Sequence, residues 1–362
     1  MPFSTTDFQF DFSHWLMWKS LLFWSIAIIG FFSALGAFGK GDGLGRSNTT
    51  WGSFALFALM LVLLGFFPIE WGYGTDRANY AYSFLQFKNN FSHVDFEQRE
   101  VGFQLIQYLL SQVMNATQFM FCISLIYLTN YLVAIRRMVS TQAYWLFAAV
   151  VLSMSFTNYN LNTMRAGLAI SFIVLGLSMY KSKVRLILCL LIAWSIHASV
   201  IIPGGIIILC RYYNNTRLFY KLWILSIPLS LVAGSFFNSL FQGMGDDERT
   251  EYLTAMNDKY NIGFRIDFIL YSLEPMLVGY YFIFKKGVSD RFYVLIYNAY
   301  LLTNMFWIFV IRANYSDRFA YLSWFLIPFI LVYPLLTQKM NLNYGEWLGL
   351  ILLGETIFQF MV

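Results

Sequence analysis

Long apolar runs alternate with short polar connections along most of this chain. A helix that crosses a bilayer needs about 20 predominantly apolar residues. We expect membrane spans near residues 15–38, 51–69, 117–135, 141–157, 163–180, 185–209, 219–242, 266–284, 291–311, 318–336 and 345–361. The pattern predicts an all-α, polytopic integral membrane protein with about 10–12 transmembrane helices, forming a single membrane domain over residues 1–362.

Composition agrees with this class. Hydrophobic residues make up 59% of the chain and charged residues 12%, whereas a soluble domain carries about 25% charged residues. The net charge of +5 is explained by basic cytoplasmic connections and requires no nucleic acid. Cys122, Cys189 and Cys210 lie in or beside apolar runs without metal-ligand spacing, so we interpret them as small apolar residues and expect neither a metal nor a cofactor.

Basic residues in the short connections predict the topology. They occur at Lys40, Arg46, Arg136, Arg137, Lys181, Lys183, Arg185, Arg211, Arg217, Lys221, Lys285, Lys286 and Lys339. Positive-inside reasoning places them all in the cytoplasm. Residues 70–116 and 243–265 then form outer-face loops, and residues 101–114, too short to span, form an interfacial or re-entrant helix in the first loop.

The run 185–209 begins and ends next to basic connections, so it must enter the membrane and return. We expect it to turn between His197 and Gly205, with Pro203-Gly204-Gly205 supplying the break. Broken helices at membrane depth are tolerated where they line a protein cavity. The topology therefore predicts a broken or re-entrant helix at the outer face.

Unusual polar groups gather at the same outer boundary. An arginine near a membrane helix is costly and usually faces a cavity or a charged partner, and a guanidinium fits phosphate oxygens bidentately. Asn158, Asn162 and Arg165 would share one face if the helix extends that far. The groups that converge are Asp76, Glu100, Arg165, His197, Arg312 and Arg318. This convergence predicts an anion site.

Each group also has a structural explanation. Arg165 can snorkel to headgroups, and His197 can be a neutral, hydrogen-bonded bundle histidine. Arg312 and Arg318 can pair with Asp317 or with lipid phosphates, and Asp76 can be a turn or cap residue. We interpret His14 and His93 as surface residues and Glu274 as a protonated structural group. No Asp-x-Asp motif for a metal-bound nucleotide-sugar occurs, which disfavours a cytoplasmic-donor glycosyltransferase.

Short motifs at these positions resemble the EpsG family, the Wzy-type polysaccharide repeat-unit polymerases. The resemblance runs from roughly Gly74 to Pro328. Its motifs are Gly74-Thr75-Asp76 with Tyr80, Glu100-Val101-Gly102-Phe103, Asn162-Thr163-Met164-Arg165-Ala166-Gly167-Leu168-Ala169, His197-Ala198-Ser199 and Arg318-Phe319-Ala320-Tyr321. Ala166 departs from the pattern, where a polar residue such as glutamine is expected, and this puts in doubt a role for that side chain but not for Arg165.

The resemblance implies a GT-C-like membrane glycosyltransferase architecture in the bacterial inner membrane, with the active site facing the periplasm or cell exterior. Such enzymes move a growing glycan from its polyprenyl-diphosphate carrier onto the next lipid-linked repeat unit. The implied partners are the lipid-linked oligosaccharide donor and acceptor, membrane lipids and a chain-length regulator protein, with no nucleic acid.

We expect Arg165, Arg312 and Arg318 to hold the diphosphate, because fixed cations stabilise the charge that grows on the leaving group. The acceptor hydroxyl needs a base within hydrogen-bond reach. His197 suits that role best by its intrinsic chemistry, with Asp76 and Glu100 as rivals. Tyr80, Asn162 and Tyr315 are the expected sugar-binding residues.

Three other functions compete with a polymerase. An O-antigen ligase uses the same donor chemistry with a different acceptor. A transporter or flippase of lipid-linked glycans often shows internal repeats, and this chain has none that we detect. A membrane acyltransferase would face a cytosolic acyl donor, whereas His197 is expected at the outer face.

Overall fold

The computed structural model describes residues 12–41, 48–70, 76–97, 100–242, 264–313 and 316–361, with the side chains of 12, 233–242 and 361 left aside. It is 82% helical and contains no strand in these ranges. The all-α prediction is therefore confirmed. Among the described residues, five helical segments are long and apolar enough to cross a membrane, namely Ser13–Phe38, Ala116–Leu152, Ile266–Lys285, Arg291–Phe309 and Ser316–Thr337. Shorter apolar helices accompany them, and the expected 10–12 spans stay a prediction.

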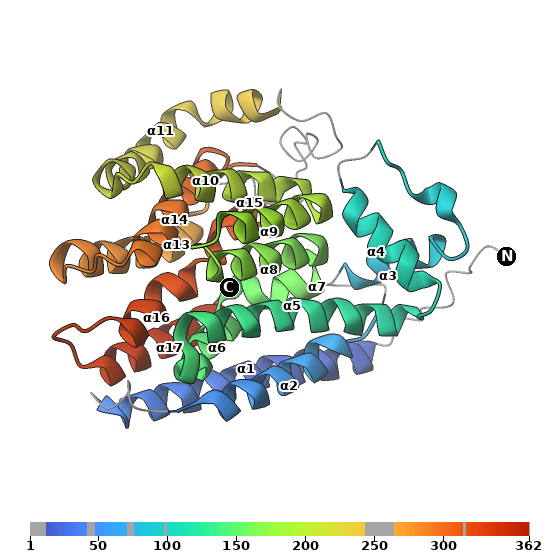
Figure 1. Cartoon of the computed structure of the whole chain (residues 1–362), viewed down its shortest axis with the longest axis horizontal. Coiled ribbons are helices and arrows are strands. Elements are labelled where there is room, and N and C mark those ends of the chain that lie inside the picture. Colours follow the sequence, from blue (N-terminus) through green and yellow to red (C-terminus); the bar gives the residue numbers. More distant parts are fainter. Residues whose placement is uncertain are drawn as a thin grey trace. The chain divides into compact units, whose positions relative to one another are not determined.

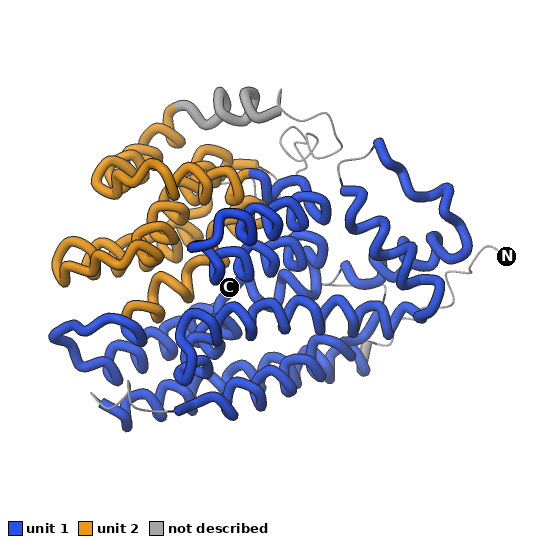
Figure 2. Tube along the Cα trace, viewed as in Figure 1, with its two compact units in different colours: residues 1–201, 335–362 blue, residues 202–334 orange. Residues whose placement is uncertain are grey.

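The chain divides into two compact units, coloured blue and orange in Figure 2. Unit 1 comprises Met1–Ile201 and Leu335–Val362, and unit 2 comprises Ile202–Pro334. Most of the residues that we expected at the site belong to unit 1.

Unit 1 contains most of the helices in Figure 1. They are α1 (Phe12–Phe38), α2 (Thr50–Gly65), α3 (Arg77–Gln86), η3 (Phe91–His93), α4 (Val101–Ser111), α5 (Ala116–Val139), η4 (Ser140–Gln142), α6 (Ala143–Leu152), α7 (Met154–Leu161), α8 (Met164–Ser178), α9 (Lys183–Ile196), η5 (Ala198–Val200) and α17 (Tyr344–Met361). α1 packs along α17, and α5 packs between α2 and α8, which in turn packs on α9. The short helices α3 and α4 lie together at the N-terminal end of α5 (Figure 1).

Unit 2 is organised around one buried helix. It contains α10 (Ile201–Tyr212, whose first residue belongs to unit 1), α11 (Thr216–Gln242), α13 (Ile266–Tyr280) with the π-helical turn η6 (Tyr281–Lys285), α14 (Arg291–Phe309), α15 (Ser316–Trp324) and most of α16 (Ile327–Thr337). α14 packs against α11, α13 and α15. Its aromatic and aliphatic side chains are almost all buried, so it forms the core of the unit.

The broken helix is confirmed, and its break lies at His197, at the start of the expected range. α9 ends at Ile196, and His197 adopts an extended conformation with φ −149° and ψ 118°. The prediction that Pro203-Gly204-Gly205 supplies the break is wrong, because Pro203 lies in the first turn of α10. The first backbone N–H groups of a helix have no intrahelical acceptor, so a proline there removes no hydrogen bond.

Other boundaries also differ from the expectation. The helix of Asn158 ends at Leu161, so Asn158, Asn162 and Arg165 do not share one continuous helical face. Within residues 70–116, α4 corresponds to the helix expected at 101–114, and α3 and η3 are further short helices that were not predicted. Most of the expected loop 243–265 lies outside the described residues.

Candidate active site

Glu100 joins three distant segments of unit 1 through one carboxylate. It precedes α4, and its side chain is 8% exposed. Oε2 accepts a hydrogen bond from Nη1 of Arg165 at 2.6 Å. Oε1 accepts a hydrogen bond from the backbone N–H of Ala198 at 3.0 Å. Oε1 also lies 2.7 Å from Nδ1 of His197, which is within ion-pair distance, although the angle does not meet that of a ring N–H hydrogen bond. A buried carboxylate is costly unless it is paired and hydrogen-bonded, so these contacts explain how Glu100 is tolerated there.

Arg165 is presented by a sharp turn between two helices. α7 ends at Leu161, and the carbonyl of Asn158 accepts the backbone N–H groups of both Asn162 and Thr163 at 2.9 Å. A Cβ at Gly167 would lie 2.1 Å from the carbonyl oxygen of Tyr159, so this turn requires glycine. Arg165 follows in the first turn of α8, and its side chain is 40% exposed. Its guanidinium is thus both anchored by Glu100 and open to an incoming anion.

His197 sits at the break between α9 and η5. Its backbone N–H donates to Ala193, which completes the last turn of α9, and its side chain is 17% exposed. Nδ1 faces Glu100, so Nε2 is the ring nitrogen turned away from the carboxylate.

Gly102 allows α4 to pack closely against α9, a contact that was not predicted from the sequence. A Cβ at Gly102 would lie 2.8–2.9 Å from the backbone O and C of Ser195, a contact that no side chain rotation relieves. The two helices thus meet backbone to backbone, two residues from Glu100 and two from His197. A lone glycine in a helical pattern was the available signal, since such a glycine often marks a close packing contact.

Tyr80 completes the cluster from α3. The guanidinium carbon of Arg165 lies 5.9 Å from the centroid of the Tyr80 ring, and that ring meets Phe103 of α4 edge-on at 6.1 Å. Asp76 precedes α3, and its carbonyl accepts the backbone N–H of Tyr80 at 3.2 Å. Asp76 and Tyr80 thus stand one helical turn apart at the start of α3. We define Glu100, Arg165, His197 and Tyr80 as the Glu100 cluster.

Asn162 lies at the end of α7, where its Nδ2 donates to Oδ1 of Asn158 at 2.8 Å. Arg312 and Arg318 belong to unit 2, and both are exposed. Nη2 of Arg312 donates to the carbonyl of Leu231 at 3.4 Å, and Arg318 lies in the first turn of α15. Their convergence with the Glu100 cluster stays a prediction, and Tyr315 lies outside the described residues.

Two further charged groups were missed or misread in the sequence. Arg77 is fully buried, and its guanidinium donates to the carbonyls of Leu64 and Gly65 at 3.0 and 3.3 Å. It thereby satisfies the C-terminal end of α2, and burial lowers the pKa of Arg77 to about 9. Its position directly after Asp76 gave no hint of this role.

His14, which we interpreted as a plain surface residue, is in fact paired. Its Nδ1 lies 2.9 Å from Oε1 of the buried Glu70, and Nε1 of Trp18 donates to its Nε2 at 3.1 Å. Because Nε2 accepts a hydrogen bond, Nδ1 carries the proton that faces Glu70. The pairing joins residues 56 positions apart, which no local sequence pattern could indicate.

Comparison with known proteins gives one match. No curated protein and no solved structure matches the chain. The family model of the EpsG family matches residues 53–354, which run from α2 into α17 and include every residue of the Glu100 cluster. The chain therefore belongs to the EpsG family of Wzy-type polymerase-like proteins, and it is a membrane protein of polysaccharide biosynthesis.

Proposed function

We propose that the protein is a Wzy-type glycosyltransferase that polymerises polyprenyl-diphosphate-linked oligosaccharide repeat units. It would act at the outer leaflet of the bacterial inner membrane, with its site facing the periplasm or cell exterior. The observation that carries this proposal is the buried carboxylate of Glu100, which holds an arginine and a histidine side by side. A cation for a leaving diphosphate and a base for an acceptor hydroxyl are the two groups that such a transfer needs.

The reaction assigns a task to each group. The acceptor hydroxyl oxygen forms a bond to the anomeric carbon of the donor glycan while the bond from that carbon to the diphosphate breaks. The bonding electrons leave with the diphosphate, and the hydroxyl proton passes to Nε2 of His197. Arg165 stabilises the charge that develops on the diphosphate, an interaction that strengthens toward the transition state.

Glu100 acts as a positioning residue in this scheme. Both of its oxygens are already engaged, by Arg165 on one side and by Ala198 N–H and His197 on the other. Its negative charge would stabilise the imidazolium that forms when His197 takes the proton. Asp76, half-buried one turn from Tyr80, remains the rival base.

The remaining assignments complete the proposal. Arg312 and Arg318 would add cations to the diphosphate, and Tyr80, Asn162 and Tyr315 would contact the sugars. No metal is required, since the arginines supply the positive charge.

A reconstituted assay tests the proposal. The purified chain is incubated with lipid-linked repeat units in the presence of EDTA, and the products are resolved on a gel. We expect a ladder of lengthened glycans. Glu100→Gln should shorten the ladder and reduce its rate roughly tenfold or more, because Arg165 and His197 lose their shared counter-charge. The matched control is Lys88→Ala, which removes an exposed charge just after α3 and should leave the ladder unchanged.

The same gel separates the alternatives. Intact substrate in every lane would contradict glycosyl transfer by this chain. A single transfer onto a different acceptor, without a ladder, would identify a ligase instead. A ladder that EDTA abolishes and Mg²⁺ restores would contradict the metal-independent mechanism.

A further inference from the structure

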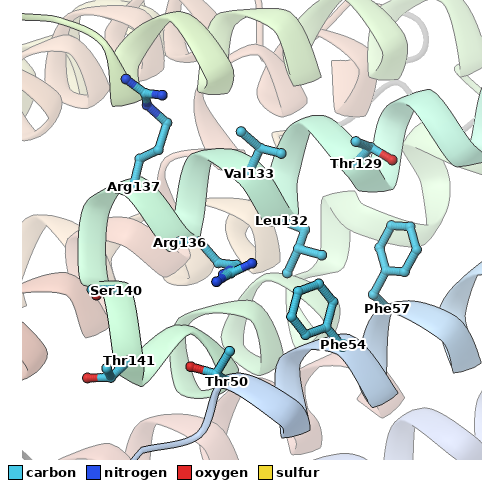
Figure 3. Close-up of a pocket in the computed structure, with 10 residues that line it drawn as sticks. All are labelled: Thr50, Phe54, Phe57, Thr129, Leu132, Val133, Arg136, Arg137, Ser140 and Thr141. Carbon is cyan, nitrogen blue, oxygen red and sulfur yellow. The ribbon is translucent and has the colours of Figure 1, made fainter.

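A second polar site lies at the other end of α5 from the Glu100 cluster. α5 has 24 residues and is therefore about 36 Å long. Its N-terminal end packs on α3 and α4, whereas its C-terminal end and the start of α2 enclose a cavity of about 560 Å³ (Figure 3). Nothing in the proposed polymerase reaction uses this cavity.

The cavity is a groove between two helices, with hydroxyl groups gathered at one end and a mostly apolar wall, interrupted only by Thr129, along the rest. Thr50, Ser140 and Thr141 lie at the end where α2 begins and α5 finishes. Phe57 and Val133 lie further along the same two helices (Figure 3). This division matches an amphipathic ligand with a polar head and an apolar tail.

Arg136 supplies the charge at the junction of the two ends. Its guanidinium carbon lies 4.8 Å from the centroid of the Phe54 ring, between the helices, whereas the Arg137 side chain points away from Phe54 (Figure 3). Within the part of the chain that the structure describes, Arg136 has no ion pair with a carboxylate. Thr50 and Thr141 contribute hydroxyl groups to the lining of the same cavity. A guanidinium there favours a ligand whose head carries a negative charge.

The surroundings of the groove are those of a lipid-facing surface. Trp51, one residue from the polar end, is 84% exposed, and Val133 on the apolar wall is 41% exposed. Basic pockets between transmembrane helices bind anionic headgroups while acyl chains lie against neighbouring apolar side chains. We propose that this groove binds an anionic phospholipid, with its phosphodiester on Arg136 and the hydroxyls and an acyl chain along Phe54, Phe57 and Val133.

Native mass spectrometry of the full purified chain tests this directly. Phosphatidylglycerol and phosphatidylcholine with identical acyl chains are titrated in turn, and bound-lipid adducts are counted. We expect phosphatidylglycerol to bind more tightly, and Arg136→Gln to weaken its binding roughly fivefold to tenfold. The matched control, Arg185→Gln, removes one exposed basic charge from the start of α9, outside the groove, and should leave binding unchanged.

A second variant keeps the test decisive if Arg136→Gln fails to fold. Val133→Trp fills the apolar wall and keeps every charge, and it should block phosphatidylglycerol. Equal binding of the two lipids, or equal loss in Arg136→Gln and Arg185→Gln, would overturn the proposal. So would displacement of the lipid by inorganic phosphate, or by a polyprenyl phosphate at equal concentration, because the site would then serve a free anion or the carrier lipid. These readouts do not depend on polymerase activity.

Discussion

Two polar clusters, one in each unit, differ in charge and in access to the outside. The Glu100 cluster of unit 1 pairs ionisable side chains, and Arg165 is 40% exposed. The cluster of unit 2 is neutral and is centred on Asn304 of α14, which is fully buried. Asn304 accepts from Nε1 of Trp223 at 2.8 Å and donates to the hydroxyls of Ser272 and Ser323 at 3.1 and 3.0 Å.

The difference indicates what each cluster does. The Asn304 cluster ties α11, α13, α14 and α15 together with bonds that are made inside the unit, and Trp324 adds a further donor to Ser272 at 3.0 Å. A fully satisfied buried network specifies packing and leaves nothing to offer a ligand. The Glu100 cluster instead holds a cation and an imidazole at a partly exposed position, which is the arrangement expected where chemistry occurs.

The largest effect should come from the cation of the Glu100 cluster. Arg165→Ala removes the group proposed to stabilise the leaving diphosphate, and we expect the rate of polymerisation to fall about 10²–10³-fold. Arg165→Lys should restore only part of the loss, since an ammonium cannot donate two parallel hydrogen bonds. Initial rates of ladder formation, normalised to folded protein, measure both. Unchanged polymer length in Arg165→Ala protein that still reaches the membrane would assign Arg165 to headgroup contact instead.

The second-largest loss of rate should come from removing the imidazole of His197. His197→Ala removes the proposed base, and we expect a rate loss of about 10²-fold. The loss in the double variant with Glu100→Gln should be smaller than the product of the two single losses, because the two residues act as a unit. His93→Ala, which removes an exposed histidine before α4, is the control. Strictly multiplicative losses would separate His197 from Glu100, and Asp76 would become the base to test.

These residues show which parts of the fold and of the site could be predicted from the sequence. Helices were predictable because apolar length is a local property, and Glu100, Arg165 and His197 stood out as polar groups at the ends of apolar runs. Their mutual contacts were not predictable, because they depend on how α4 meets α9. The break at Ser153, within a run expected to be one span, also left no mark, since apolar residues flank it on both sides.

A smaller loss of rate should come from a change that moves Glu100 without altering its side chain. Gly102→Ala adds a methyl group against the backbone of Ser195, so α4 must move away from α9 and carry Glu100 with it. We expect a rate loss of roughly tenfold, because a misplacement of about 1 Å can already cost about 10²-fold in rate. Gly354→Ala is the control, because its added methyl group meets no atom within 4 Å. It should leave the rate unchanged. A fully active Gly102→Ala protein would show that the separation of α4 and α9 does not govern the site.

The smallest effect on activity should come from the neutral cluster. Asn304→Ala leaves the indole N–H of Trp223 without its acceptor in a buried position. It also removes a donor from the hydroxyls of Ser272 and Ser323, although Ser323 still donates to the carbonyl of Ala320. We expect the protein to lose about 2–4 kcal/mol of stability, seen as a lower melting temperature in detergent. Ladder formation per folded molecule should stay within about twofold of wild type, because the network makes no contact proposed for the reaction.

The neighbouring residue provides the control for that last expectation. Thr303 is fully buried, and among the described residues its hydroxyl has no hydrogen-bond partner. Thr303→Val removes that hydroxyl at nearly constant volume and should leave stability unchanged or slightly raised. If Asn304→Ala instead reduced the rate per folded molecule as strongly as Arg165→Ala, the neutral cluster would also serve the reaction. Exposure and charge would then no longer distinguish the reacting region from the structural one.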